Sequence, residues 1–81
     1  MRAAFDWEEG LNNVLIRYYV NGNIAAQAYL NSLNIYSCVV YGYGDCGWKY
    51  FKTLNDAQKH CDDILADAGV KVLDAQYRIL L

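Results

Sequence analysis

A glycine-rich stretch in the middle of this 81-residue chain has the spacing of a nucleotide-binding loop. It reads Gly42-Tyr-Gly-Asp-Cys-Gly47 and follows an apolar, β-prone segment. In dinucleotide-binding folds such a loop opens a helix, whose N-terminal amides bind the pyrophosphate. Here the next residues, Trp48-Lys-Tyr-Phe51, are typical of a strand, and the Asp45 carboxylate would repel a phosphate. The stretch therefore predicts a hairpin turn and not a nucleotide site.

Cysteine and histidine side chains are the next candidates for chemistry, as zinc ligands or as a nucleophile with its base. The chain has Cys38, Cys46, Cys61 and His60, without the Cys-x-x-Cys spacing of zinc sites. His60 and Cys61 are adjacent, so they would point about 100° apart on a helix. A cysteine nucleophile also needs a base that a third group orients. We therefore expect free thiols, no metal or other cofactor, and no enzymatic activity.

Acidic side chains could imitate the spacing of nucleic-acid phosphates. The acidic positions that could form such a patch are Glu8, Glu9, Asp45, Asp56, Asp62, Asp63 and Asp67. Asp62 and Asp63, together with Asp67, form the tightest local cluster. The alternative is that these residues form an ordinary solvated surface.

The overall composition bounds the class of protein. A hydrophobic fraction of 56% is too high for a disordered chain, and 81 residues suffice for a single domain, residues 1–81, with one small core. A net charge of −2 makes nucleic acid an unlikely partner. No apolar run reaches the roughly 18 residues of a membrane span, and the acidic N-terminal segment does not resemble a signal peptide. We expect a cytoplasmic protein that binds other proteins and no membrane.

A β-hairpin is predicted in the first half of the chain. Residues 14–20 are mostly β-branched or aromatic, and Asn21-Gly22 follows them as a strong hairpin signal. Residues 23–30 would form the return strand. A two-residue turn would pair Val20 with Asn23.

A rival interpretation makes residues 7–19 a helix and residues 24–32 a second helix. Asp6 and Glu9 have the spacing of a capping box, which favours a helix start. Gly10 and the asparagine pair at 12–13 weaken this helix. We prefer the hairpin and keep the helices as the alternative.

The second half of the chain predicts two strands, one helix and a final strand. Strands are expected at 35–42 and 47–53, and the alternation at 70–81 predicts the last strand, with a short helix as its alternative. Thr53 has the position of a helix N-cap, and Gly69 suits the residue after the helix end. The helix has an apolar stripe of Leu54, Ala57, Cys61, Ile64, Leu65 and Ala68. The fold class is therefore α+β: an antiparallel sheet of four to five strands with one amphipathic helix on one face.

One helix covers only one face of such a sheet, so aromatic residues on the other face need an explanation. Phe51 is expected to contact the helix, whereas Trp48 and Tyr50 point to the opposite face. That face could be covered by the N-terminal segment around Phe5 and Trp7, or by a second copy of the chain. It could instead be a contact surface, since tyrosine and tryptophan dominate binding hot spots. A stacking platform for single-stranded nucleic acid would need interleaved basic residues beyond the two nearby lysines.

The segment from Trp48 to Leu65 resembles a pattern common in small phage and mobile-element proteins. In that pattern a strand ends in an aromatic residue, and a Thr-Leu-x-x-Ala helix start packs back on an antiparallel sheet. Anti-CRISPR proteins and other phage inhibitors of host enzymes are similar in size, acidity and compact β/α layout. The resemblance covers about 35 residues, is architectural and transfers no functional residue. It implies a stoichiometric inhibitor or modulator of a larger protein, with nucleoprotein effectors among such targets.

The sequence thus predicts a small protein-binding module that occupies a surface of a larger protein. The expected contact residues are Tyr41, Tyr43, Asp45, Trp48, Tyr50, Asp62 and Asp63. The first alternative is a structural homodimer with no separate target. The second is a nucleic-acid-binding sheet module.

Overall fold

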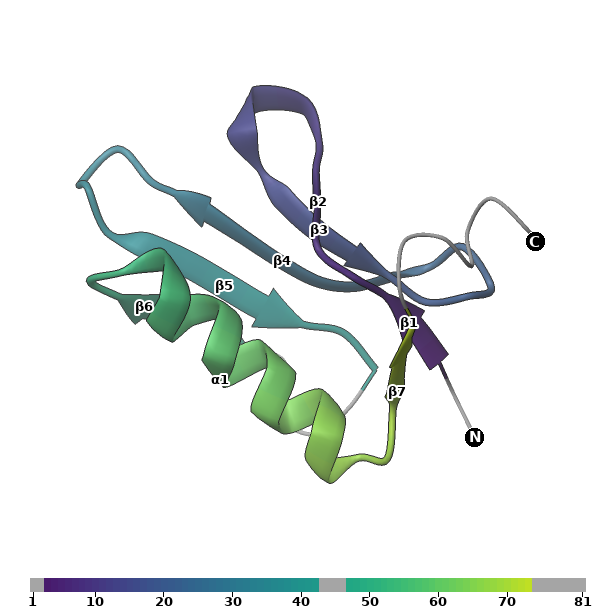
Figure 1. Ribbon diagram of the computed structural model, residues 1–81. Coiled ribbons are helices and arrows are strands. Elements are labelled where there is room, and N and C mark those ends of the chain that lie inside the picture. Colours follow the sequence, from purple (N-terminus) through teal and green to yellow (C-terminus); the bar gives the residue numbers. More distant parts are fainter. Residues whose placement is uncertain (1–2, 43–46, 74–81) are drawn as a thin grey trace.

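The computed structural model describes residues 3–42 and 47–73 of the chain and has an α+β architecture. Five antiparallel strands form the main sheet in the order β2-β3-β4-β5-β6, and one helix, α1, packs on one face (Figure 1). The strands are β2 (Glu8–Glu9), β3 (Leu15–Tyr18), β4 (Ile24–Leu30), β5 (Tyr36–Val40) and β6 (Lys49–Phe51); α1 is Leu54–Asp67. The predicted fold class is confirmed.

Asparagine and glycine residues reverse the chain at each hairpin between β2 and β5. The loops are closed by backbone hydrogen bonds from Gly10 to Val14 (2.7 Å), Tyr19 to Asn23 (2.7 Å) and Asn31 to Ile35 (2.9 Å). The first loop contains the 3-10 turn η1 (Leu11–Asn13). Positive φ angles occur at Asn12, Asn13, Gly22 and Asn34. Asparagine and glycine tolerate this left-handed conformation, so they mark where the strands turn back.

The β3–β4 hairpin confirms the preferred interpretation of residues 14–30, and the rival helices are wrong. The predicted pairing of Val20 with Asn23 is also wrong, because the Tyr19 amide donates to the Asn23 carbonyl and Gly22 to Tyr19. The loop has three residues instead of two, and the register shifts by one between Arg17 and Tyr18. The extra residue forms a bulge. The bulge increases the local twist of the strand and turns more side chains at this strand end toward the core.

The helix begins and ends where the capping residues predict. The Asp56 amide donates to the Thr53 hydroxyl at 3.1 Å. At the other end, Val70 N–H donates to the Leu65 carbonyl at 2.9 Å and Gly69 N–H to Ala66 at 3.0 Å, with Gly69 at a φ of 80°. These two bonds are a Schellman motif. The predicted stripe is buried or half-buried except Ala68, which is exposed because it follows the last helical turn.

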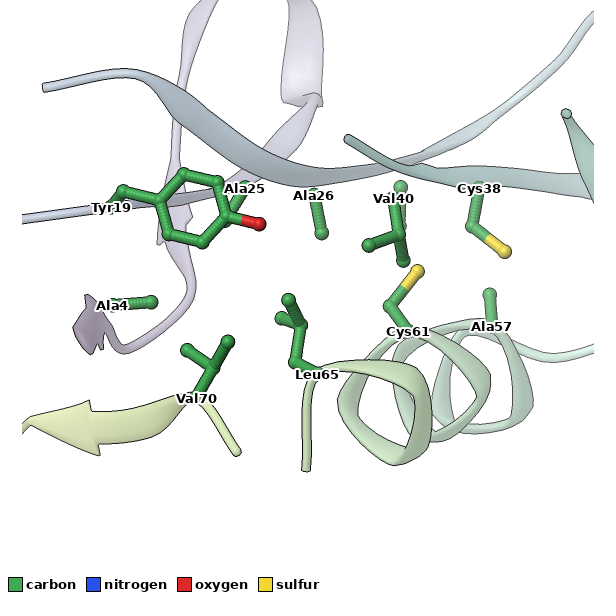
Figure 2. Close-up of a cluster of buried hydrophobic side chains, with 11 residues drawn as sticks. Ala4, Tyr19, Ala25, Ala26, Cys38, Val40, Ala57, Cys61, Leu65 and Val70 are labelled. Atoms are coloured by element: carbon green, nitrogen blue, oxygen red, sulfur yellow. The ribbon is translucent and has the colours of Figure 1, made fainter. Parts of the chain in front are cut away.

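Small side chains fill the space between helix and sheet. Fully buried alanines from the strands and helix lie around Cys38, Cys61 and Leu65, which are the largest fully buried side chains (Figure 2). Such a core leaves little room for aromatic rings. Among the described residues, Phe5 and Tyr19 are the only buried aromatic ones.

A strand follows the helix, as predicted, but it does not join the main sheet. β7 (Lys71–Leu73) pairs in parallel with β1 (Ala3–Phe5) as a separate two-stranded sheet (Figure 1). Val70 is buried against the core, so the chain leaves the helix beside the N-terminal strand. The rest of the predicted strand, residues 74–81, lies outside the described residues.

Candidate functional site

The main sheet has one face that α1 covers and one that it does not. The strand register places Arg17, Ala26 and Cys38 on the covered face. The residues between them alternate to the other side. We call this side the open sheet face. It comprises Ile16, Tyr18, Ile24, Gln27, Tyr29, Ser37, Val39 and Tyr50 from the strands, with Tyr41 and Trp48 beside them.

The N-terminal segment does not cover the open sheet face, so that expectation is wrong. The Trp7 indole donates from Nε1 to Asp62 Oδ1 on α1 at 3.0 Å. Phe5 is buried, and its carbonyl accepts a hydrogen bond from Arg17 Nη1 at 3.1 Å. Both residues therefore lie on the helix side, held there by the helix and by a buried arginine. Within residues 3–42 and 47–73, no helix or strand forms a second layer over the open sheet face.

Aromatic side chains on the open sheet face are held by contacts across the strands. Tyr29 and Trp48 meet edge to face, with ring centroids 5.6 Å apart and an interplanar angle of 84°. The Tyr41 hydroxyl donates to Gln27 Oε1 at 3.3 Å. Trp48 and Tyr41 remain 42% and 39% exposed, and Tyr50 is 65% exposed. The Tyr29, Trp48 and Tyr41 rings are thus held by their neighbours, which lowers the entropy cost of binding.

A groove of about 490 Å³ extends this surface at the β4–β5 loop. Asn31, Ser32, Leu33, Ile35 and Tyr50 line it. The Asn31 carboxamide fixes the loop: Oδ1 accepts from the Leu33 and Ile35 amides at 2.8 and 3.2 Å, and Nδ2 donates to Ser37 Oγ at 3.0 Å. Leu33 is consequently held outward at 75% exposure. An apolar groove between an exposed leucine and an exposed tyrosine suits an apolar side chain of a partner.

A second hollow, of about 470 Å³, lies between the β2–β3 loop and the start of α1. Its lining includes Glu9, Asn12, Leu15 and Leu54. Asn12 adopts a left-handed backbone conformation because the turn requires it, so its backbone strain belongs to the hairpin. Most of this hollow is lined from the helix side of the sheet, but Tyr29 of the open sheet face also belongs to its lining.

Two of the three predicted acidic contacts, Asp62 and Asp63, lie on α1, away from the open sheet face. Asp62 Oδ1 accepts from Arg17 Nη2 at 2.8 Å and from the Trp7 indole, while Asp63 pairs with Lys59 at 2.9 Å. Arg17 is 3% exposed and its guanidinium carbon lies 5.1 Å from the Trp7 ring centroid. Asp62 therefore neutralises a buried cation, which costs less than leaving that charge unpaired.

The structure brings three of the seven predicted contact residues together. Tyr41, Trp48 and Tyr50 share the open sheet face, and the Asp62/Asp63 pair is on the other side of the sheet. Tyr43 and Asp45 lie outside the described residues.

The sequence prediction did not identify Arg17 as the partner of Asp62. Two signals pointed to it: an arginine within an otherwise apolar and aromatic strand needs an anion, and Asp62 borders the apolar stripe of the helix.

Cys38 and Cys61 are free and buried, and their surroundings oppose thiolate chemistry. Burial raises the pKa of the Cys38 thiol, and burial followed by the neighbouring Cys38 raises the pKa of Cys61. Cys61 Sγ is 3.9 Å from the Val39 carbonyl oxygen. His60 packs on Phe51, with ring centroids 5.2 Å apart. Among the described residues, no group of three or more His, Cys, Asp or Glu side chains is placed to hold a metal ion.

Comparisons add no assignment to this geometry. Within the described part of the chain, no helix has the length and apolar character to cross a membrane. No family model matches the chain, and no curated protein or solved structure matches it.

Proposed function

We propose that the chain is a protein-binding module that docks its open sheet face on a larger protein and thereby inhibits or modulates it stoichiometrically. The observation that carries the proposal is the ordered row of exposed aromatic rings on a sheet face without a second layer among the described residues. Tyrosine and tryptophan supply large, rigid contact area with a polar end, and they are enriched at binding hot spots.

The charges of the open sheet face favour a protein over a nucleic acid. Except for Glu8, which is paired with Ile16, the strand residues that the register places on this face are apolar, aromatic or uncharged polar. Single-strand binders combine stacking aromatics with a positive groove along the backbone. In the described strands, Arg17 and Lys49 are both paired with residues of the helix side.

The resemblance to phage inhibitors sets the first class of target to test. An inhibitor of this kind acts by occupying a surface, so it needs no reaction of its own. Host enzymes, including nucleoprotein effectors, are therefore the proposed partners.

Affinity capture with matched variants tests the proposal. Tagged wild-type protein, Tyr50→Ala and Lys59→Ala would be compared in lysate of the host. Tyr50 is largely exposed on the open sheet face, whereas Lys59 is 73% exposed on the helix side. We expect one larger protein to be retained by the wild type and by Lys59→Ala but lost with Tyr50→Ala. Equal retention by all three would refute the open sheet face as the contact. Recovery of the chain alone, as a dimer that Tyr50→Ala dissociates, would replace the proposal with the homodimer.

A further inference from the structure

Among the described strands, β6 forms one edge of the main sheet. The side to which its backbone N–H and C=O groups point follows from the hydrogen bonds of its neighbours. The Tyr41 amide donates to the Ala25 carbonyl at 2.9 Å, and at the other end of the β4–β5 ladder Asn31 donates to Ile35. In an antiparallel sheet the residues of a strand bond alternately to the two sides. The odd-numbered residues of β5 therefore bond to β4, and Tyr36 and Cys38 bond to β6.

This alternation leaves the backbone of Tyr50 directed out of the sheet. Phe51 and Lys49 are the residues opposite Tyr36 and Cys38, so they form the hydrogen-bonded pairs of the β5–β6 ladder. Tyr50 is opposite Ser37 and is the non-bonded pair between them. Its N–H and C=O consequently point away from β5, in the geometry that an added strand uses.

The side chains around this edge define the chemistry of what could pair with it. Lys52 is exposed and places a positive charge two residues after Tyr50; Lys49, exposed on the other side of Tyr50, already has an interaction within the structure. Tyr50 also lines the groove with Leu33 and Ile35. The opposite edge, β2, carries Glu8 and Glu9, which would repel an acidic strand. The β6 edge thus combines two outward backbone groups, an apolar groove and a positive flank.

We propose that an extended segment of the protein partner adds to β6 as a further antiparallel strand, with acidic residues beside the lysines and an apolar side chain in the groove at Tyr50. The inference rests on the proposed function and names the chemistry of its partner. A second copy of the chain fits less well, because both β6 edges carry the same positive charge and no acidic residue to match it. Lysines at a sheet edge oppose self-pairing while they attract an acidic strand.

Selection from a random dodecapeptide display library, followed by amide hydrogen exchange of the intact chain with the selected peptides, tests the inference. We expect enriched peptides that alternate apolar with acidic residues and slow the exchange of the Tyr50 amide. Tyr50→Pro removes this N–H, whereas Tyr50→Ala keeps it. The proline variant should bind about tenfold more weakly than the alanine variant. Lys52→Glu should weaken binding, and Lys59→Glu on the helix should not.

The outcomes separate the inference from the proposed function. Peptides that bind the aromatic rings but leave Tyr50 exchange unchanged would overturn strand addition and leave the open sheet face as a protein-binding site. Failure to enrich any peptide would count against both. Protection of the Tyr50 amide by self-association, without peptide, would identify the second copy as the occupant and overturn the assignment of an acidic partner strand. Because exchange is measured on the wild type, the test stands even if the proline variant does not fold.

Discussion

Removal of the Asp62 carboxylate should destabilise the fold, because it leaves the buried Arg17 without its anion. Within the described part of the chain Arg17 Nε has no hydrogen-bond partner, and Nη1 bonds to the Phe5 carbonyl. A second carboxylate oxygen, on Asp6, is 3.9 Å from Nη1, and the Asp6 side chain is 63% exposed. Breaking a fully buried ion pair costs about 3–5 kcal/mol. The Asp62 side chain is 42% exposed, so water can partly replace it, and we expect about 2 kcal/mol for Asp62→Ala.

A loss of this size is large for a small domain. Marginal stability of about 0.05–0.15 kcal/mol per residue makes about 2 kcal/mol a substantial fraction of the total. The melting temperature should fall by roughly 10 °C. Urea unfolding followed by tryptophan fluorescence measures the change, since Trp7 donates to the same carboxylate.

Asp63→Ala is the matched control, because Asp63 is adjacent to Asp62 in the sequence and both side chains of its ion pair with Lys59 are exposed. We expect a change of at most about 0.5 kcal/mol for this variant. Equal, small effects of the two substitutions would refute the buried-pair reasoning. Loss of target binding by Asp62→Ala at unchanged stability would return Asp62 to the role of a contact residue.

Three further perturbations follow from the described contacts. Trp48→Ala should cost about 1 kcal/mol in urea unfolding, because it removes the edge-to-face contact with Tyr29 from a partly exposed ring. Gly22→Ala should cost about 1 kcal/mol in the same assay: a Cβ there meets nothing within 4 Å, so only the φ of 94° opposes it. Cys38 and Cys61 should resist alkylation in the folded chain and react in urea, as peptide mapping would show. Because burial raises both pKa values from 9.0, stability from the protonated thiols should be complete below about pH 9 and decline as pH rises further.

Local signals explain how much of the fold could be predicted. Thr53 and Gly69 mark the helix ends through bonds to residues within one turn, so their meaning does not depend on the rest of the chain. The reversal at Asn21-Gly22 was predictable for the same reason. The length of this loop could not be predicted, because it depends on whether Tyr19 and Ala25 are both buried. Tertiary packing decides that burial.

The candidate site could be predicted where it follows from strand alternation. Period-two alternation placed Trp48 and Tyr50 opposite Phe51, and the structure agrees. The role of Asp62 could not be predicted in this way, because its partner Arg17 is 45 positions earlier in the sequence. The parallel pairing of β1 with β7 is similarly long-range, and three-residue strands carry too little periodicity to reveal it.

Site-specific photo-crosslinking would show which side of the sheet meets the partner. A photoreactive phenylalanine analogue at Tyr50 would report the open sheet face, and the same analogue at Lys59 would report the helix side. We expect the analogue at Tyr50 to crosslink to the captured partner and the analogue at Lys59 not to. Crosslinking from Lys59 alone would contradict binding through the open sheet face and move the binding surface to the helix.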